Sequence, residues 1–285
     1  MNFDQQLQHL IEEALKEDVG TGDHSTLSCI SAAEQGTAVL KIKEPGILAG
    51  VDVAEKIFRH REPSAVFKAF KFDGDAMDIG EKAFEVKASV HTILQCERLV
   101  LNCMQRMSGI ATLTRQYTNK LKGYKTKLLD TRKTTPNFRL LEKEAVRIGG
   151  GINHRFGLYD MIMLKDNHID YCGGISKAIE KAAQYVQTTT PGLKIEIETR
   201  SIADVQEVLA SGRGKVFRIM LDNFKPQQIS EALKLINNDF ETEASGGINL
   251  DNIEQYAATG VNYVSVGALI HQARSLDLSL KAVIN

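Results

Sequence analysis

Residues 127–170 read KLLDTRKTTPNFRLLEKEAVRIGGGINHRFGLYDMIMLKDNHID, and the rest of the chain is organised around this stretch. An apolar run ends at Leu129 in a polar cluster, Pro136 opens a helical segment, and a glycine triplet ends it. A second apolar run, Met161–Leu164, ends in Lys165. Proline is favoured at the start of a helix and glycine just after its end, so we interpret the stretch as a strand–helix–strand unit. Both predicted strands end in charged side chains, and parallel α/β folds bind ligands at that edge of the sheet.

Cationic side chains gather at these two strand ends and on the glycine-rich loop before the second strand. Arginine offers planar paired donors to a carboxylate or phosphate, and lysine offers a compact point charge. A single loop cation is as readily a solvated surface residue. Five cations beside few acids, chiefly Asp130 and Asp166, favour a polyanionic ligand instead. The five are Arg132, Lys133, His154, Arg155 and Lys165.

The same stretch closely resembles the signature region of the quinolinate phosphoribosyltransferase family, the decarboxylating nicotinate-nucleotide pyrophosphorylases of NAD synthesis. The likeness continues in family order through EDVGTGDHST, ERLVLNCMQRMSGIAT, LDNFKP, EASGGI and VSVGALIH, and covers nearly the whole chain. It implies a pentosyltransferase that transfers the phosphoribosyl group of phosphoribosyl pyrophosphate to quinolinate with decarboxylation. The products would be nicotinate mononucleotide, pyrophosphate and CO₂.

Composition excludes several other classes of protein. The 285 residues are 43% hydrophobic, which is enough for two moderate cores, and the net charge of −1 does not suggest nucleic-acid binding. No long apolar run or basic, apolar N-terminus suggests a membrane span or a secretory signal. The four cysteines form no CxxC pair, and Cys96 and Cys103 share a helical stripe, which is typical of buried thiols. We therefore expect a soluble cytoplasmic protein.

The order of predicted elements indicates an α/β protein with two domains. An amphipathic helix ends before Gly20, and alternating segments after it predict a small antiparallel sheet in an N-terminal α+β domain, residues 1–113. A long helix from about residue 91 to 122 leads into repeated βα units, which predict a barrel domain over residues 114–270. We count six parallel strands, too few for a closed eight-stranded barrel and in agreement with the incomplete α/β barrel of the family. The tail, residues 271–285, alternates like a strand and is expected to return to the N-terminal sheet.

Carboxylates end two later strands of the predicted barrel. Glu196 and Glu198 alternate with isoleucines and share a face, and Glu198 is the better candidate because it lies at the carboxyl end. Asp222 ends the next strand. Such carboxylates accept hydrogen bonds from ribose hydroxyls or hold Mg²⁺ that bridges phosphates, although salt bridges to the cations are the simpler alternative.

The last two predicted strands end in glycine turns, which let backbone N–H groups approach a phosphate. One SGG turn means little, but two on consecutive strands are moderately specific. Gly247 stands where the family more often has asparagine, so only backbone contacts are expected there. The predicted phosphate-binding residues are Ser245, Gly246, Gly247, Gly267 and Ala268. The resemblance adds His271, for which a histidine at a helix start is the alternative.

The resemblance also implies a role for each matching residue. The metal implied is Mg²⁺, held mainly through substrate phosphates, with Glu198 and Asp222 as candidate ligands. The assembly implied is a homodimer in which Arg106 reaches the neighbouring active site, with a higher oligomer left open. The catalytic residues implied are Lys133, Lys165, Glu198 and Asp222, of which Lys133 turns toward pyrophosphate and the two acids toward the ribose. The quinolinate-binding residues implied are Arg106, Thr131, Arg132, His154, Arg155, Met163 and Lys165.

Three other functions remain as alternatives. A barrel aldolase would use Lys165 as a Schiff-base nucleophile, but its pocket would be poor in arginine. A non-catalytic anion-binding relative would not need the complete set of charged residues. A phosphoribosyltransferase acting on nicotinate itself would need fewer cations, because that acceptor carries one carboxylate.

Overall fold

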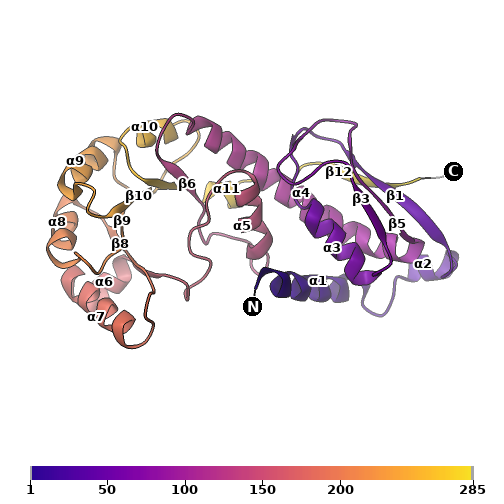
Figure 1. The fold of residues 1–285 in the computed structure, drawn as a ribbon, viewed down its shortest axis with the longest axis horizontal. Helices are drawn as coiled ribbons and strands as arrows, with labels where there is room; N and C mark the ends of the chain where they lie inside the picture. The colour runs from indigo at the N-terminus through magenta and orange to yellow at the C-terminus, as the bar shows by residue number, and fades with distance from the viewer. Residues whose placement is uncertain (1, 284–285) are drawn as a thin grey trace. The chain divides into compact units, whose positions relative to one another are not determined.

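The computed structural model describes residues 2–283, and the chain divides into two units (Figure 1). Unit 1 contains residues 2–115, 134–150 and 269–283, and unit 2 contains residues 116–133 and 151–268. These boundaries differ from the predicted ones by two residues at each end of the barrel domain and at one internal segment. Residues 134–150, which we had assigned to the barrel domain, lie in unit 1.

Unit 1 is built on a four-stranded antiparallel sheet of order β12-β1-β5-β3. The C-terminal strand β12 pairs with β1, and Leu280 stands opposite Leu40. Phe58, Phe67 and Phe84 pack beside this sheet, with ring centroids 4.5 to 6.3 Å apart. The strands are β1 (Gln35–Ile42), β3 (Val66–Ala69), β5 (Lys82–Ser89) and β12 (Leu278–Ala282), and β2 (Gly46–Ile47) pairs separately with β4 (Ala76–Met77).

The helices of unit 1 follow from caps and apolar spacing. Asn2 caps the first helix, since its side chain accepts from the Gln5 N–H and its own N–H donates to the Gln5 side chain. Two helices, α2 and α3, were not predicted. In α3, Val51, Ala54 and Phe58 repeat at helical spacing and are buried. The helices are α1 (Phe3–Val19), α2 (His24–Cys29), α3 (Val51–Arg61) and α5 (Arg139–Ile148); α4 (Val90–Lys120) and α11 (Ala268–His271) each cross a unit boundary.

Unit 2 contains the predicted six-stranded parallel sheet, in the order β6-β11-β10-β9-β8-β7. Figure 1 shows α7 to α10 along the outer side of these strands, so the sheet forms the inner wall of an incomplete barrel. The strands are β6 (Lys127–Leu129), β7 (Ile162–Leu164), β8 (Ile195–Thr199), β9 (Arg218–Asp222), β10 (Glu241–Ser245) and β11 (Tyr263–Ser265). The helices are α6 (Asp166–Cys172), α7 (Ile175–Thr188), α8 (Ile202–Ser211), α9 (Pro226–Ile236) and α10 (Ile253–Ala257).

Residues 127–170 form a strand–helix–strand segment, as predicted, but its two strands are not neighbours in the sheet. β6 and β7 stand at opposite ends of the sheet order, and α5 between them belongs to unit 1. The end of α5 lies close to α4: a Cβ on Gly149 would come within 2.6 Å of the Thr114 side chain, and Arg115 donates to the Gly149 carbonyl at 3.1 Å. This close packing on α4 explains why α5 belongs to unit 1.

Two further expectations concern cysteines and membranes. Cys96 and Cys103 are free and buried, as predicted, and burial raises the pKa of each thiol to about 12. Over residues 2–283, no helix combines the length and apolar character needed to cross a membrane.

Candidate active site

A cavity of about 650 Å³ opens at the carboxyl ends of the unit 2 strands. A second hollow, of about 550 Å³, lies at the amino-terminal ends of β9 and β10, away from the edge where such folds bind ligands. The residues that line the first cavity include most of the predicted site: Thr131, Arg132, Lys133, His154, Arg155, Met163, Lys165, Glu198, Asp222, Ser245, Gly246, Gly247 and Gly267.

The strand register explains how these side chains meet. Residues opposite each other in a parallel pair share a face, and Glu198 and Glu243 both stand opposite Met220. Residues two positions along each strand fall on that same inner face, which adds Arg218 and Asp222. The isoleucines and leucines between them point to the other face, toward the helices.

Cations form one part of the cavity lining. Arg132 and Arg155 are half-buried, whereas Lys133 and Lys165 are exposed. The Arg155 guanidinium donates to the Met161 carbonyl at 3.2 Å. Burial lowers the pKa of Arg155, and the nearby positive charge of Arg132 lowers it further. Two crowded, partly desolvated guanidinium groups favour the binding of an anion.

Glu198 and Asp222 form the acidic part of the same cavity. Lys165 Nζ lies 3.3 Å from Glu198 Oε2. Burial raises the pKa of Glu198, Lys165 opposes that rise, and the negative charge of Asp222 adds to it. Burial likewise raises the pKa of Asp222 against the effect of Lys165. Two carboxylates that disfavour each other's charge are suited to accept hydroxyl groups or to share a cation.

The glycine turn after β10 packs tightly against the end of β9. Gly246 and Gly247 have φ of +96° and +65°, which favours glycine. A Cβ on Gly246 would come within 3.0 Å of the Asn223 backbone nitrogen. The Asn223 N–H donates to the Ser245 carbonyl at 2.8 Å, so the two strand ends are joined directly beside the cavity.

Three predicted site residues do not line this cavity. Ala268 follows β11, and His271 and Arg106 lie in unit 1. The Arg106 guanidinium donates to Glu142 Oε1 at 2.9 and 3.0 Å and to the carbonyls of Ala273 and Ile270. Its contribution to a neighbouring subunit stays a prediction.

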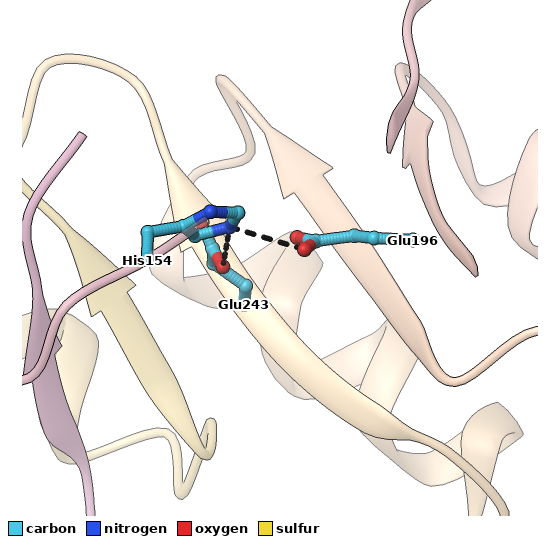
Figure 2. Close-up of side chains that lie close together, drawn as sticks. All are labelled: His154, Glu196 and Glu243. Atoms are coloured by element: carbon cyan, nitrogen blue, oxygen red, sulfur yellow. Dashed lines mark ion pairs between the residues drawn. The ribbon is translucent and has the colours of Figure 1, made fainter. Parts of the chain in front are cut away.

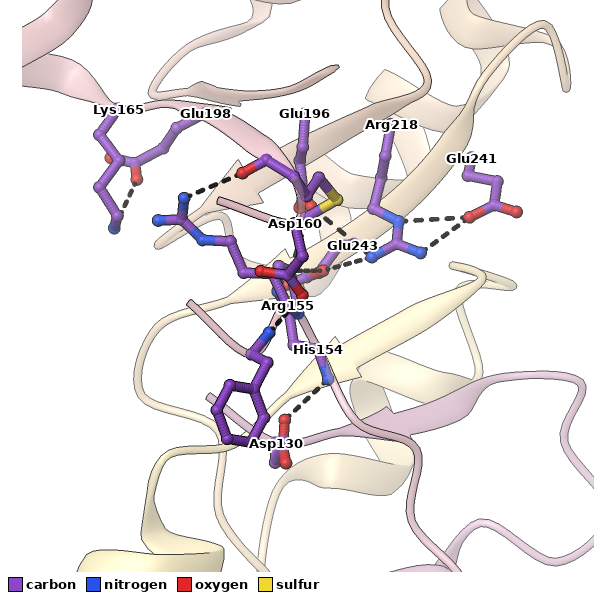
Figure 3. A network of polar contacts seen from close by, with 12 residues as sticks. Asp130, His154, Arg155, Asp160, Lys165, Glu196, Glu198, Arg218, Glu241 and Glu243 are labelled. Atoms are coloured by element: carbon purple, nitrogen blue, oxygen red, sulfur yellow. Dashed lines mark hydrogen bonds and ion pairs between the residues drawn. The ribbon is translucent and has the colours of Figure 1, made fainter. Parts of the chain in front are cut away.

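The structure also brings in residues that the sequence reasoning missed. Glu243 lines the cavity, and Arg218 lies behind it, with Nη1 3.2 Å from Glu243 Oε2 (Figure 3). Both are on period-two strands, RIMLD and ETEAS, in which charged residues alternate with apolar or small ones. The alternation that identified Glu198 on β8 would also have identified Glu243 and Arg218.

One group of buried side chains has the composition of a metal site. Within the described residues, only His154, Glu196 and Glu243 form a group of three His, Cys, Asp or Glu side chains close enough to share an ion. The Arg218 guanidinium lies 3.6 Å from Glu196 and 3.2 Å from Glu243. This cation already neutralises the charge that a metal would neutralise, so we interpret the group as an ionic cluster.

The incomplete barrel and its cavity lined by cations are typical of enzymes that bind phosphorylated substrates at the carboxyl ends of their strands. Family models described as the N-terminal and C-terminal domains of quinolinate phosphoribosyl transferase match residues 23–108 and 110–281. The chain belongs to the quinolinate phosphoribosyltransferase family, which confirms the resemblance seen in its sequence.

Individual relatives agree with this assignment. The chain is 41% identical to a probable nicotinate-nucleotide pyrophosphorylase [carboxylating] of Bacillus subtilis, over 98% of this chain and 94% of that one. It is 43% identical to quinolinate phosphoribosyltransferase [decarboxylating] 1 of Nicotiana glauca, over 96% and 82% of the two chains. The structure of NadC from Streptococcus pyogenes superposes with a TM-score of 0.90 at 40% identity, covering 98% of each chain.

Proposed function

We propose that this chain transfers the phosphoribosyl group of phosphoribosyl pyrophosphate to quinolinate and releases pyrophosphate and CO₂, leaving nicotinate mononucleotide. One observation carries the proposal: a single cavity combines Arg132, Arg155 and Lys165 with the carboxylates Glu198 and Asp222. Cations suit the two carboxylates of quinolinate, and acids suit the hydroxyls of a ribose.

Electrostatics explains why so many cations are needed. Quinolinate is a dianion, and the phosphoribosyl donor carries several further negative charges. Two like charges about 4 Å apart repel by roughly 4 kcal/mol at an effective dielectric near 20. Fixed guanidinium and ammonium groups offset this repulsion without reorganising, which also holds the two substrates in reacting order.

The transfer step exchanges one bond at the anomeric carbon of the ribose. The bond to the pyrophosphate oxygen breaks with its electron pair, and the pyridine nitrogen of quinolinate supplies the pair for the new bond. The ribose carbon is positive in between, so Glu198 and Asp222 stabilise it while they accept its hydroxyls. Lys133, at the exposed rim of the cavity, is assigned to the departing pyrophosphate.

Decarboxylation follows because the ring nitrogen becomes quaternary. The carbon–carbon bond to the adjacent carboxylate breaks, CO₂ leaves, and the electron pair stays on the ring carbon beside the positive nitrogen. That carbon then takes a proton from water. Arg132, Arg155 and Lys165 orient the dianion for this step, with Thr131 and Met163 completing the wall.

Mg²⁺ and a partner subunit complete the proposal. Glu198 and Asp222 would hold Mg²⁺ together with the donor phosphates, where the ion supplies positive charge to the leaving group. The family resemblance supports a homodimer in which Arg106 enters the neighbouring cavity. Its contacts with Glu142 would then be exchanged for contacts with substrate. A cytoplasmic location belongs to the same proposal.

Release of labelled CO₂ from carboxyl-labelled quinolinate tests the reaction. The purified protein should release label only when phosphoribosyl pyrophosphate and Mg²⁺ are both present. Nicotinate, offered in place of quinolinate, should give no nucleotide. Formation of nucleotide from nicotinate without CO₂ release, or no turnover of either acceptor, would contradict the proposal.

Two single substitutions test whether the cations bind quinolinate and the acids bind the phosphoribosyl donor. Arg155→Ala should raise KM for quinolinate by about tenfold or more, because a charged hydrogen-bond partner of the dianion is lost. Glu198→Gln keeps the shape of the side chain and should act mainly on the phosphoribosyl donor. If each variant affected both substrates equally, the assignment of the two halves would be wrong.

A further inference from the structure

A buried ionic cluster lies on the inner face of the unit 2 strands, beside the cavity (Figure 2). His154 Nε2 is 3.0 Å from Glu196 Oε2 and 3.2 Å from Glu243 Oε2. Both glutamates are 0% exposed, and His154 is 9% exposed. His154 and Glu243 line the cavity, whereas Glu196 lies behind them on β8. Desolvating these charged groups is costly, so their burial next to a binding site suggests that they have a role there.

Both ring nitrogens of His154 are occupied within the protein. Nε2 faces the two carboxylates, and Nδ1 accepts a hydrogen bond of 2.7 Å from the backbone N–H of Arg155. Because Nδ1 is an acceptor, the ring proton resides on Nε2, the nitrogen that lies beside the two carboxylates. Nδ1 of His154 is therefore engaged within the protein, and direct contact of the His154 ring with quinolinate stays a prediction.

The protons of this cluster are shared among its members. Burial opposes a charged imidazole, but Glu196 and Glu243 more than offset it and raise the pKa of His154 to about 9. A second ring proton at Nδ1 would nevertheless stand against the Arg155 N–H. Burial and the charge of Glu243 also raise the pKa of Glu196 to about 7, so His154 and Glu196 compete for the same proton.

His154 contacts Arg155, a cation that lines the cavity. Arg155 lines the cavity, and its guanidinium is held from the other side by the Met161 carbonyl at 3.2 Å. The backbone N–H of His154 donates to Asp130 Oδ1 at 2.7 Å, which ties this end of the loop to the strand end after β6. Figure 3 shows these contacts in sequence from Asp130 through His154 and Arg155.

We propose that Glu196 and Glu243 are positioning residues that act through His154 on Arg155, and so set the affinity for quinolinate. The inference rests on the proposed function, since it describes how the quinolinate end of that cavity is built. Loss of either carboxylate weakens the charge that holds Nε2, so the imidazole can turn about its side-chain torsion and release the Arg155 N–H. A guanidinium–carboxylate pair depends on orientation, so a loosened Arg155 binds the dianion less tightly.

The chain offers a matched control on β10, the strand that also carries Glu243. Glu241 Oε2 lies 2.9 Å from Arg218 Nη2, an ion pair on the same inner face that does not involve His154. Glu196 also pairs with Arg218, at 3.6 Å, and contacts His154 in addition. Glu196→Leu and Glu241→Leu thus each remove a carboxylate from Arg218, but only the first removes one from His154.

The experiment measures the dissociation constants of quinolinate and of phosphoribosyl pyrophosphate separately, by calorimetry, on the full-length protein. Glu196→Leu should weaken quinolinate binding by about tenfold or more and leave donor binding within about twofold. Glu196→Gln, which keeps an acceptor for Nε2–H, should recover most of the lost affinity. Glu241→Leu should change neither constant.

A double variant tests whether the effect passes through His154. If it does, His154→Leu combined with Glu196→Leu should lose no more quinolinate affinity than His154→Leu alone. Full additivity, or an equal loss in Glu241→Leu, would overturn the inference and point to general destabilisation. Wild-type protein that bound no quinolinate at all would overturn the proposed function first, and this inference with it.

Discussion

Gly246→Ala is the substitution whose effect the structure defines most closely. Gly246 has φ of +96°, and its added Cβ would lie 2.8 Å from Asn223 Cγ and 3.0 Å from the Asn223 backbone nitrogen. Both distances are shorter than ordinary contacts, and the second involves backbone that cannot move alone. Gly247 is the matched control, because it has φ of +65° and no heavy atom within 4 Å of an added Cβ.

The two variants share one penalty and differ in another. A positive φ costs an L-residue about 1 to 2 kcal/mol, partly offset by about 0.4 to 1 kcal/mol from a stiffer unfolded chain. Only Gly246→Ala adds overpacking, at about 1 to 3 kcal/mol. We therefore expect it to lower the free energy of unfolding by about 1 to 3 kcal/mol more than Gly247→Ala.

Displacement of Asn223 by the added Cβ should also weaken the binding of phosphoribosyl pyrophosphate. Asn223 donates from Nδ2 to Asp222 Oδ2 at 2.6 Å, so a shifted Asn223 removes a partner of the acid assigned to the ribose. Gly246→Ala should weaken binding of phosphoribosyl pyrophosphate by about tenfold, equivalent to about 1.4 kcal/mol. Urea unfolding followed by circular dichroism and calorimetric titration of the donor measure the two effects. Equal unfolding midpoints and equal donor affinities in both variants would refute the reasoning.

Three predictions concern unit 1. Burial raises the pKa of Asp73 to about 6, so the folded protein holds this proton more tightly than the unfolded chain and stability falls as pH rises from about 4 to about 6. Asp73→Asn should flatten this loss, about 3 kcal/mol at most, in urea titrations at pH 4 and pH 7; an unchanged pH dependence would contradict it. Gly109→Ala places a Cβ 2.9 Å from the carbonyl carbon of Arg274 and should cost about 1 to 3 kcal/mol of unfolding free energy, so a neutral effect would be the contrary result. Arg106→Leu leaves the fully buried Glu142 without its cation and should cost about 3 to 5 kcal/mol, most of it recovered in the double variant with Glu142→Leu; thermal unfolding that shows no recovery would exclude this pairing.

Local pattern was sufficient to predict most of the elements. The alternation in residues 193–198 predicted β8, which spans Ile195–Thr199, and the apolar spacing after residue 91 predicted α4. These patterns succeed because a half-buried strand or helix repeats its apolar side chains with its own backbone period. The helix α3 was not predicted, although its apolar residues repeat at helical spacing. The sequence therefore contained the information needed to predict it.

The cations of the site could also be found in the sequence, for a topological reason. Arg132, Lys133 and Lys165 directly follow predicted strands, and parallel strands bring their carboxyl ends to one edge. The cavity lining contains all three. Alternation along β8 places Glu196 and Glu198 on one face, and the position of Glu198 at the carboxyl end separated it, at the cavity, from Glu196 behind.

The amino-acid sequence by itself determined the family, the succession of strands and helices, and the edge of the barrel where charged groups gather. Only the tertiary structure decided that α5 belongs to unit 1, that Arg106 pairs with Glu142, and that His154 faces two glutamates. Backbone periodicity and strand-end position act over a few residues and can be read locally. Partner choice between side chains tens of residues apart depends on strand register and on close packing, which no local pattern specifies.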